Sequence, residues 1–73
     1  MATIELKADI TGSIWKILKS AGDAVEEDEP ILIMESMKME IPVASPEAGV
    51  LKEVRVNEGD TVENGTVLAV VEP

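Results

Sequence analysis

Apolar and polar side chains alternate partially along this chain, in short runs rather than long ones. The alternation is clearest at residues 39–43 and 50–56, and a period of two residues is typical of strands that bury one face. The runs are rich in Ile, Val and Leu, which favour strands. We predict strands at 3–7, 13–18, 31–35, 39–43, 50–56 and 67–72, with shorter steps near 24–25 and 61–62. The acidic run 26–29 favours a solvated loop over a helix start, because no apolar helical face follows it.

The two halves of the chain resemble each other when one is shifted by 37 residues. The shift aligns Gly12-Ser-Ile14-Trp-Lys-Ile17 with Gly49-Val-Leu51-Lys-Glu-Val54, Gly22-Asp23-Ala-Val25 with Gly59-Asp60-Thr-Val62, and Ile31-Leu-Ile33-Met-Glu35 with Leu68-Ala-Val70-Val-Glu72. An internal repeat of this kind predicts approximate two-fold symmetry. We therefore predict an all-β domain spanning residues 1–73, a flattened barrel or sandwich of about eight short strands in two antiparallel sheets.

Glycines recur where the chain is predicted to bend, because turns often need a positive φ that glycine adopts without steric cost. The dipeptide Asn64-Gly65 is a strong turn signal, whereas the first half has Asp28-Glu29 at that place. Five glycines are predicted to be structural turn residues: Gly12, Gly22, Gly49, Gly59 and Gly65.

The repeat also predicts where the middle of the chain lies. Residues 37–38 should cap the end opposite the two termini. If Met37 and Lys38 are the central residues of a tight hairpin turn, Ser36 faces Met39, and the pairs behind it are Glu35 with Glu40 and Met34 with Ile41. Such turns usually contain Asn-Gly, so Met-Lys breaks a local rule at an exposed point, which suggests function. The alternative interpretation is ordinary strand alternation, with the methionines filling a small core.

Composition narrows the classes of function. The chain has 73 residues with 45% hydrophobic side chains, which suits a single folded domain with a small core. It contains no Cys and no His, so thiolate and imidazole chemistry are excluded, and no metal-ligand set or catalytic constellation stands out. A net charge of −9 and a single aromatic residue, Trp15, argue against nucleic-acid binding. With no long apolar run and no signal peptide, we expect a soluble cytoplasmic domain with no membrane partner.

The residues around the predicted turn resemble a known family. Glu35-Ser36-Met37-Lys38-Met39 is similar to the Glu-Ala-Met-Lys-Met signature of biotinyl domains, the biotin carboxyl carrier type of the biotinyl/lipoyl attachment family. The resemblance extends over about residues 3–72 and includes further segments: Gly22-Asp23-Ala-Val25, Glu40-Ile41-Pro42-Val43-Ala44-Ser45-Pro46, Gly49, Gly59-Asp60 and Asn64-Gly65. One departure is Ala8-Asp9-Ile10-Thr11-Gly12, where many biotinyl domains have Ala-Pro-Met-Pro-Gly.

The resemblance implies a carrier rather than an enzyme. Lys38 matches the lysine that a biotin protein ligase joins to biotin through an amide bond, and the tethered biotin would carry carboxyl groups between biotin carboxylase and carboxyltransferase sites. Met37 and Met39 match the flanking methionines, for which partner recognition is expected. Three further residues are candidates for recognition by the ligase or partners: Glu35, Ser36 and Glu40. The isolated domain is expected to be monomeric.

Three other interpretations remain open. A lipoyl domain shares the fold and a hairpin lysine, but its lysine is usually preceded by Asp and followed by Ala, unlike Met37 and Met39 here; lipoate, or both cofactors, is the alternative on Lys38. An unmodified β-sandwich interaction module would bind a partner through an apolar tip and would tolerate loss of Lys38. An independent enzyme is disfavoured, because no nucleophile and base are brought together by any motif.

Overall fold

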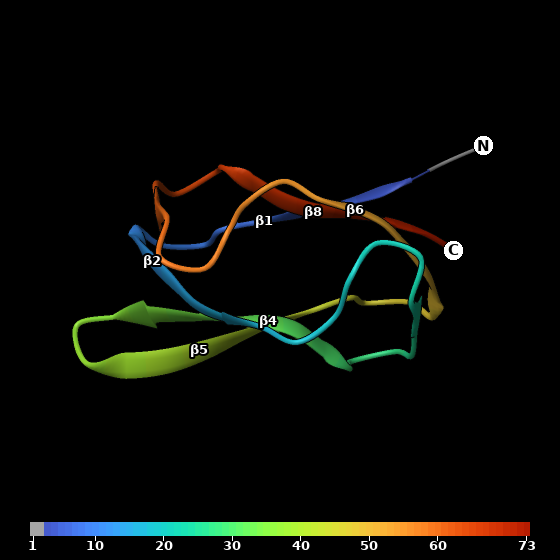
Figure 1. The fold of residues 1–73 in the computed structure, drawn as a ribbon, viewed down its shortest axis with the longest axis horizontal. Coiled ribbons are helices and arrows are strands. Elements are labelled where there is room, and N and C mark those ends of the chain that lie inside the picture. The colour runs from blue at the N-terminus through green and yellow to red at the C-terminus, as the bar shows by residue number, and fades with distance from the viewer. Residues whose placement is uncertain (1–2) are drawn as a thin grey trace.

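The computed structural model describes residues 3–73, which form eight β-strands and, within that range, no helix. The strands are β1 (Ile4–Lys7), β2 (Gly12–Ile17), β3 (Ala24–Val25), β4 (Pro30–Ser36), β5 (Met39–Ala44), β6 (Gly49–Val54), β7 (Thr61–Val62) and β8 (Val67–Glu72). They make two four-stranded antiparallel sheets with the orders β1-β8-β6-β3 and β5-β4-β2-β7. The sheets are the two layers of a flattened barrel (Figure 1). The predicted all-β architecture and number of strands are confirmed.

The sequence repeat is a structural repeat. A shift of 37 residues carries β2 onto β6 and β3 onto β7 with the same bounds, and brings β1 onto β5 and β4 onto β8. The same shift exchanges the two sheets, since each strand keeps its position in the sheet order. Even the irregularities repeat: the register between β2 and β4 shifts at Ile14/Lys16, and that between β6 and β8 at Leu51/Glu53. Each half of the chain therefore supplies two strands to each sheet.

The core follows from the alternation in the strands. Two clusters of buried side chains lie between the sheets, and the half-buried Val43 and Val54 pack against both. The clusters contain repeat-related residues: Ile14 with Leu51, Met34 with Val71, and Val62 with Val25. The one buried polar side chain in the described range, Ser45, donates its hydroxyl to the carbonyl of Glu47. Burial of these apolar groups is the main force holding a small domain together.

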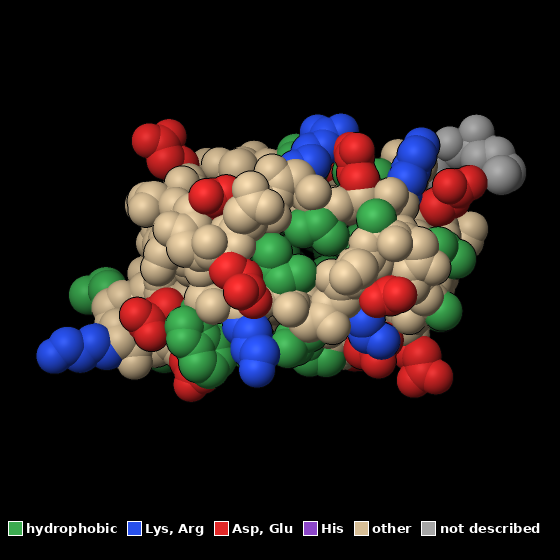
Figure 2. All heavy atoms as spheres, in the orientation of Figure 1, with side chains coloured by type: hydrophobic (Ala, Val, Ile, Leu, Met, Phe, Trp, Pro, Cys, Tyr) green, Lys and Arg blue, Asp and Glu red, His purple; other side chains and the backbone are tan. Residues whose placement is uncertain are grey.

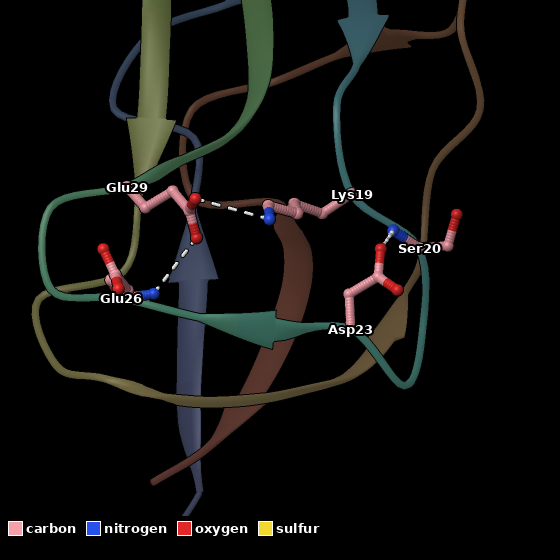
Figure 3. A network of polar contacts seen from close by, with 5 residues as sticks. All are labelled: Lys19, Ser20, Asp23, Glu26 and Glu29. Carbon is pink, nitrogen blue, oxygen red and sulfur yellow. Dashed lines mark hydrogen bonds and ion pairs between the residues drawn. The ribbon is translucent and has the colours of Figure 1, made fainter.

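Four turns of the domain are built alike. They span 20–23, 26–29, 57–60 and 63–66, and in each the N–H of the fourth residue donates to the carbonyl of the first. In each, the side chain of the fourth residue accepts the N–H of the first, as when Ser20 N–H donates to Asp23 Oδ2 at 2.8 Å. Figure 3 shows two of them, with Glu29 accepting both the N–H of Glu26 and the ammonium of Lys19 at 3.3 Å. The aspartate of each Gly-Asp motif is thus a turn cap.

The third position of these turns has a positive φ. Gly22, Gly59 and Gly65 hold it with φ between 92° and 97°, which confirms that these three are turn residues. Asp28 holds it in the remaining turn with φ 64°, so Glu27 and Asp28 are the equivalents of Asn64-Gly65, one residue earlier than predicted. The acidic run 26–29 is the predicted loop, not a helix.

The prediction is wrong for the other two glycines, Gly12 and Gly49, which are not turn residues. They begin β2 and β6, and neither has a positive φ. A Cβ at Gly12 would lie 2.7 Å from the carbonyl oxygen of Glu35, and one at Gly49 would meet the carbonyl of Glu72 in the same way. These glycines are therefore required for the close approach of neighbouring backbones.

The barrel is elongated, with extents of 35 × 18 × 18 Å. The β4–β5 hairpin forms one end, and the C-terminus and the start of β1 lie at the other (Figure 1). The pairing of Ile4 with Val71 holds these two chain segments together. The middle of the chain is therefore opposite the ends, as the repeat predicts; the part of that prediction concerning residues 1–2 lies outside the described residues. No helix in residues 3–73 is long and apolar enough to cross a membrane.

Candidate functional site

The candidate site is the tip of the β4–β5 hairpin. Ser36 pairs with Met39, Glu35 with Glu40 and Met34 with Ile41, the register predicted from the sequence. Met37 and Lys38 are the two residues between the strands, with φ of 51° and 65°. Two consecutive positive φ values define a tight turn of type I′, which matches the right-handed twist of the flanking strands. Neither residue is Gly, Asn or Asp, so both hold a conformation that costs roughly 1–2 kcal/mol each.

Side chains at the tip are open to solvent. Met37 is 92% exposed and Met39 is 64% exposed, and Lys38 between them is exposed as well. Met34 is 1% exposed, so the alternative of a core-filling methionine is correct for Met34 and wrong for the other two. In Figure 2 a basic side chain protrudes at the hairpin end of the molecule, with hydrophobic side chains beside it. The tip therefore offers a primary amine flanked by two thioethers.

Electrostatic partners do not hold the amine in place. The ion pairs formed among residues 3–73 are Lys19 with Glu29 and Arg55 with Glu53, and Lys38 belongs to neither. Glu35 and Glu40 are exposed and directly opposite each other on β4 and β5. Two like charges in this arrangement destabilise the hairpin, so they do not serve its folding. They place negative charge on the surface beside the amine.

The base of the hairpin is braced by a segment far away in sequence. Ser36 Oγ donates to the carbonyl of Thr11 at 3.0 Å, so this predicted recognition residue is turned toward the barrel. The side-chain amide of Asn64 donates to the carbonyl of Asp9 at 2.9 Å, and the backbone N–H of Asn64 donates to Thr11 Oγ1. Gly12 lets β2 approach the carbonyl of Glu35 closely. The sequence predicts a turn at Asn64-Gly65 but does not predict this bracing role of Asn64.

A groove of about 350 Å³ lies between β1 and β5, the outer strands of the two sheets. Its walls include repeat-related pairs, Ile4 with Ile41 and Leu6 with Val43, so it lies on the pseudo-two-fold axis. Within residues 3–73, no group of three or more acidic side chains is arranged to hold a metal ion. The chemically distinctive feature of the described surface is therefore the amine at the tip.

The described residues form a two-sheet domain that presents one lysine at the turn of a protruding hairpin. The family model described as biotin-requiring enzyme, the biotin/lipoyl family, matches residues 5–71. The chain therefore belongs to the biotin/lipoyl attachment family. Domains of this family are carrier modules within larger enzyme systems and have no catalytic site of their own.

The relatives of this chain include a protein named for biotin/lipoyl attachment and one named for a dihydrolipoyllysine residue. A biotin/lipoyl attachment protein of Bacillus subtilis (strain 168) is 46% identical over 59 residues, 81% of each chain. The dihydrolipoyllysine-residue succinyltransferase component of the 2-oxoglutarate dehydrogenase complex of Staphylococcus saprophyticus is 50% identical over 68 residues, 92% of this chain and 16% of that protein. The crystal structure of Kluyveromyces lactis urea carboxylase matches with a TM-score of 0.93 and 32% identity, covering 99% of this chain and 6% of that one.

Proposed function

We propose that Lys38 is the residue that carries the cofactor, and that the cofactor is biotin. The observation that carries this proposal is the hairpin tip, where Lys38 is held in a strained turn between two exposed methionines. Strain and exposed apolar groups persist at one point when function requires them there. Family membership supplies the class of modification, and the Met-Lys-Met pattern favours biotin within it.

Attachment requires that Lys38 Nζ enter the active site of a biotin protein ligase. The unprotonated amine attacks the acyl carbon of biotinyl-adenylate, the acyl–phosphate bond breaks, AMP departs, and the nitrogen loses a proton as the amide forms. The narrow hairpin suits this reaction, because a turn of two residues at the end of an elongated domain can be surrounded by another protein. Met37 and Met39 then supply adaptable apolar contacts beside the amine.

When joined to Lys38, biotin would supply a group able to carry a carboxyl group to an acceptor. The chain itself contributes the tether: the lysine side chain lies beyond the end of the barrel, so the group it carries can reach sites on separate enzymes. Tethering raises the effective concentration of that group at each site. We propose biotin carboxylase and carboxyltransferase components as the partners and the cytoplasm as the compartment.

Lipoate on Lys38 is the second candidate, favoured by the 50% identity to a dihydrolipoyllysine-residue succinyltransferase component. Both cofactors are joined to a hairpin lysine by an amide bond, so the turn geometry suits either. The difference lies in which ligase accepts the side chains around Lys38, and the two exposed methionines support the biotin assignment.

Intact mass of the protein purified from its native cells, with the Lys38→Arg variant as control, tests both candidates. A biotin-sized increment with retention on streptavidin, lost in Lys38→Arg, is the expected result. A lipoyl-sized increment would replace biotin by lipoate. Absence of any increment under biotin- and lipoate-replete conditions would overturn the assignment of Lys38 as a carrier residue, and would leave the unmodified interaction module.

A further inference from the structure

The methionines near the hairpin tip divide sharply by exposure. Met37 and Met39 place their thioethers in solvent, whereas Met34, only three residues before Met37, is 1% exposed and lies in the core. Thioether sulfur is oxidised at rates that follow its access to solvent. The structure therefore separates two reactive methionines from one protected methionine within a single hairpin.

We propose that Met37 and Met39 form an oxidative modification site whose substrate is hydrogen peroxide. A sulfur lone pair attacks one peroxide oxygen, the O–O bond breaks, and proton transfer releases the other oxygen as water. The thioether is oxidised by two electrons to a sulfoxide, and the peroxide is reduced by two electrons. The reaction is reversible through methionine sulfoxide reductases.

The electrostatics of the tip suit a neutral oxidant. Glu35 and Glu40 lie directly behind the turn, and the chain carries a net charge of −9. An anionic oxidant is repelled by this field, whereas hydrogen peroxide, which is uncharged at neutral pH, is not. The two thioethers therefore remain accessible to peroxide although the surrounding surface is acidic.

Oxidation at these two positions changes recognition without changing the fold. The sulfoxide replaces a flexible apolar group with a polar, chiral one on each side of Lys38. Neither Met37 nor Met39 belongs to the core clusters, so the free energy of unfolding should not change. Acylation of Lys38 should slow, because the ligase must remove water from two polar sulfoxide groups in order to bury them. This consequence rests on the proposed function; the oxidation itself does not.

The experiment exposes the purified, unmodified protein to hydrogen peroxide and maps each methionine by peptide mass spectrometry over time. We expect Met37 and Met39 to be oxidised at least about tenfold faster than Met34. The oxidised protein is then acylated with biotin protein ligase, biotin and Mg·ATP, and in parallel with a lipoate ligase and lipoate. We expect the initial rate to fall about tenfold and to recover after treatment with methionine sulfoxide reductases.

Two variants make the result specific. The Met37→Leu/Met39→Leu variant should show no dependence on peroxide, each rate being compared with that of the same variant before oxidation. The Met34→Leu variant, a nearly volume-conserving core change, should keep the full dependence. Unfolding in urea before and after peroxide should give the same midpoint.

Three outcomes would contradict the proposal in different places. Oxidation of Met34 as fast as Met37 would overturn the site. Equal acylation rates before and after oxidation would overturn its effect on Lys38. If neither ligase acylates the untreated protein, the proposed function fails, and the methionine map still decides whether the tip is an oxidation site.

Discussion

The hairpin turn at the tip differs in design from the four capped turns at 20–23, 26–29, 57–60 and 63–66. Those four share one construction, with a side-chain cap at the fourth residue and a positive φ at the third, and three of them place glycine there. The hairpin turn has two positive φ values, at Met37 and Lys38, and no glycine. Sequence and conformation agree in the three capped turns that contain glycine, and they disagree most at the hairpin turn, where two consecutive residues other than glycine hold a positive φ. The disagreement marks the residues that folding alone does not select.

Replacing Met37 and Lys38 by residues that favour a type I′ turn should have the largest effect on cofactor attachment and on stability. In the Met37→Asn/Lys38→Gly variant we expect complete loss of cofactor attachment together with a gain of about 2 kcal/mol in the free energy of unfolding, because Asn-Gly adopts the type I′ turn without strain. Intact mass and urea unfolding measure the two effects. A variant that lost stability would show that Met37 and Lys38 are structural turn residues after all.

The next largest effect is expected at Gly12. This residue lies beside the hairpin end of β4, whereas its repeat partner Gly49 lies at the opposite pole. Gly12→Ala should lower the free energy of unfolding by about 1–3 kcal/mol, since the new Cβ meets the carbonyl of Glu35 at 2.7 Å. Gly49→Ala is the matched control, because the Cβ added there meets the equivalent carbonyl of Glu72 at the end of the barrel away from the hairpin.

We expect both glycine variants to be less stable, measured by urea unfolding. At a temperature where both remain folded, only Gly12→Ala should slow the acylation of Lys38, because only that change displaces β4 next to the hairpin. Equal acylation rates in the two variants would show that the packing of β2 against β4 does not position the tip.

A smaller effect is expected in the turn 26–29, the one capped turn without glycine. Asp28 holds φ 64° where its repeat partner Gly65 holds 92°. Asp28→Gly should raise the free energy of unfolding by about 0.5–1 kcal/mol, and Gly65→Asp should lower it by a similar amount. Thermal unfolding followed by circular dichroism measures both. Cofactor attachment should stay unchanged in Asp28→Gly, since Asp28 lies neither on the hairpin nor in the turn that contains Asn64.

The smallest effect concerns the facing carboxylates behind the tip. Removing one charge with Glu40→Gln should stabilise the domain by about 0.2–1 kcal/mol at low salt, because a like-charge cross-strand pair is relieved. The gain should shrink at 1 M salt, where the screening length is about 3 Å. Urea unfolding at both salt concentrations is the measurement. A gain that salt did not reduce would mean that the carboxylates do not repel each other.

Much of this molecule could be predicted because its information is local or repeated. Alternation located the strands, and the shift of 37 residues predicted both the symmetry and the position of Met37 and Lys38. The hairpin register followed from counting outward from the turn. The turns at Gly22, Gly59 and Gly65 were predictable for the same reason, since each sits in a short motif with polar neighbours.

What could not be predicted depends on contacts between distant segments. Gly12 and Gly49 have the same sequence appearance as turn glycines, and only the neighbouring backbone shows that they serve close approach. Asn64 braces residues more than fifty positions away in the chain, a contact that no local pattern encodes. Among residues 3–73, the division of the methionines into one buried and two exposed residues likewise depends on the hairpin register and on how far the hairpin extends beyond the sheet.

The exchange of the two sheets by the internal repeat has a consequence for stoichiometry. The turn at 37–38 is the joint between the two halves, and at the opposite pole β8 and β1 lie side by side as the symmetry equivalents of β4 and β5. Among residues 3–73 the fold therefore has two related poles but one hairpin tip. Each folded copy of this domain presents one tip amine, at the point where its two halves are joined.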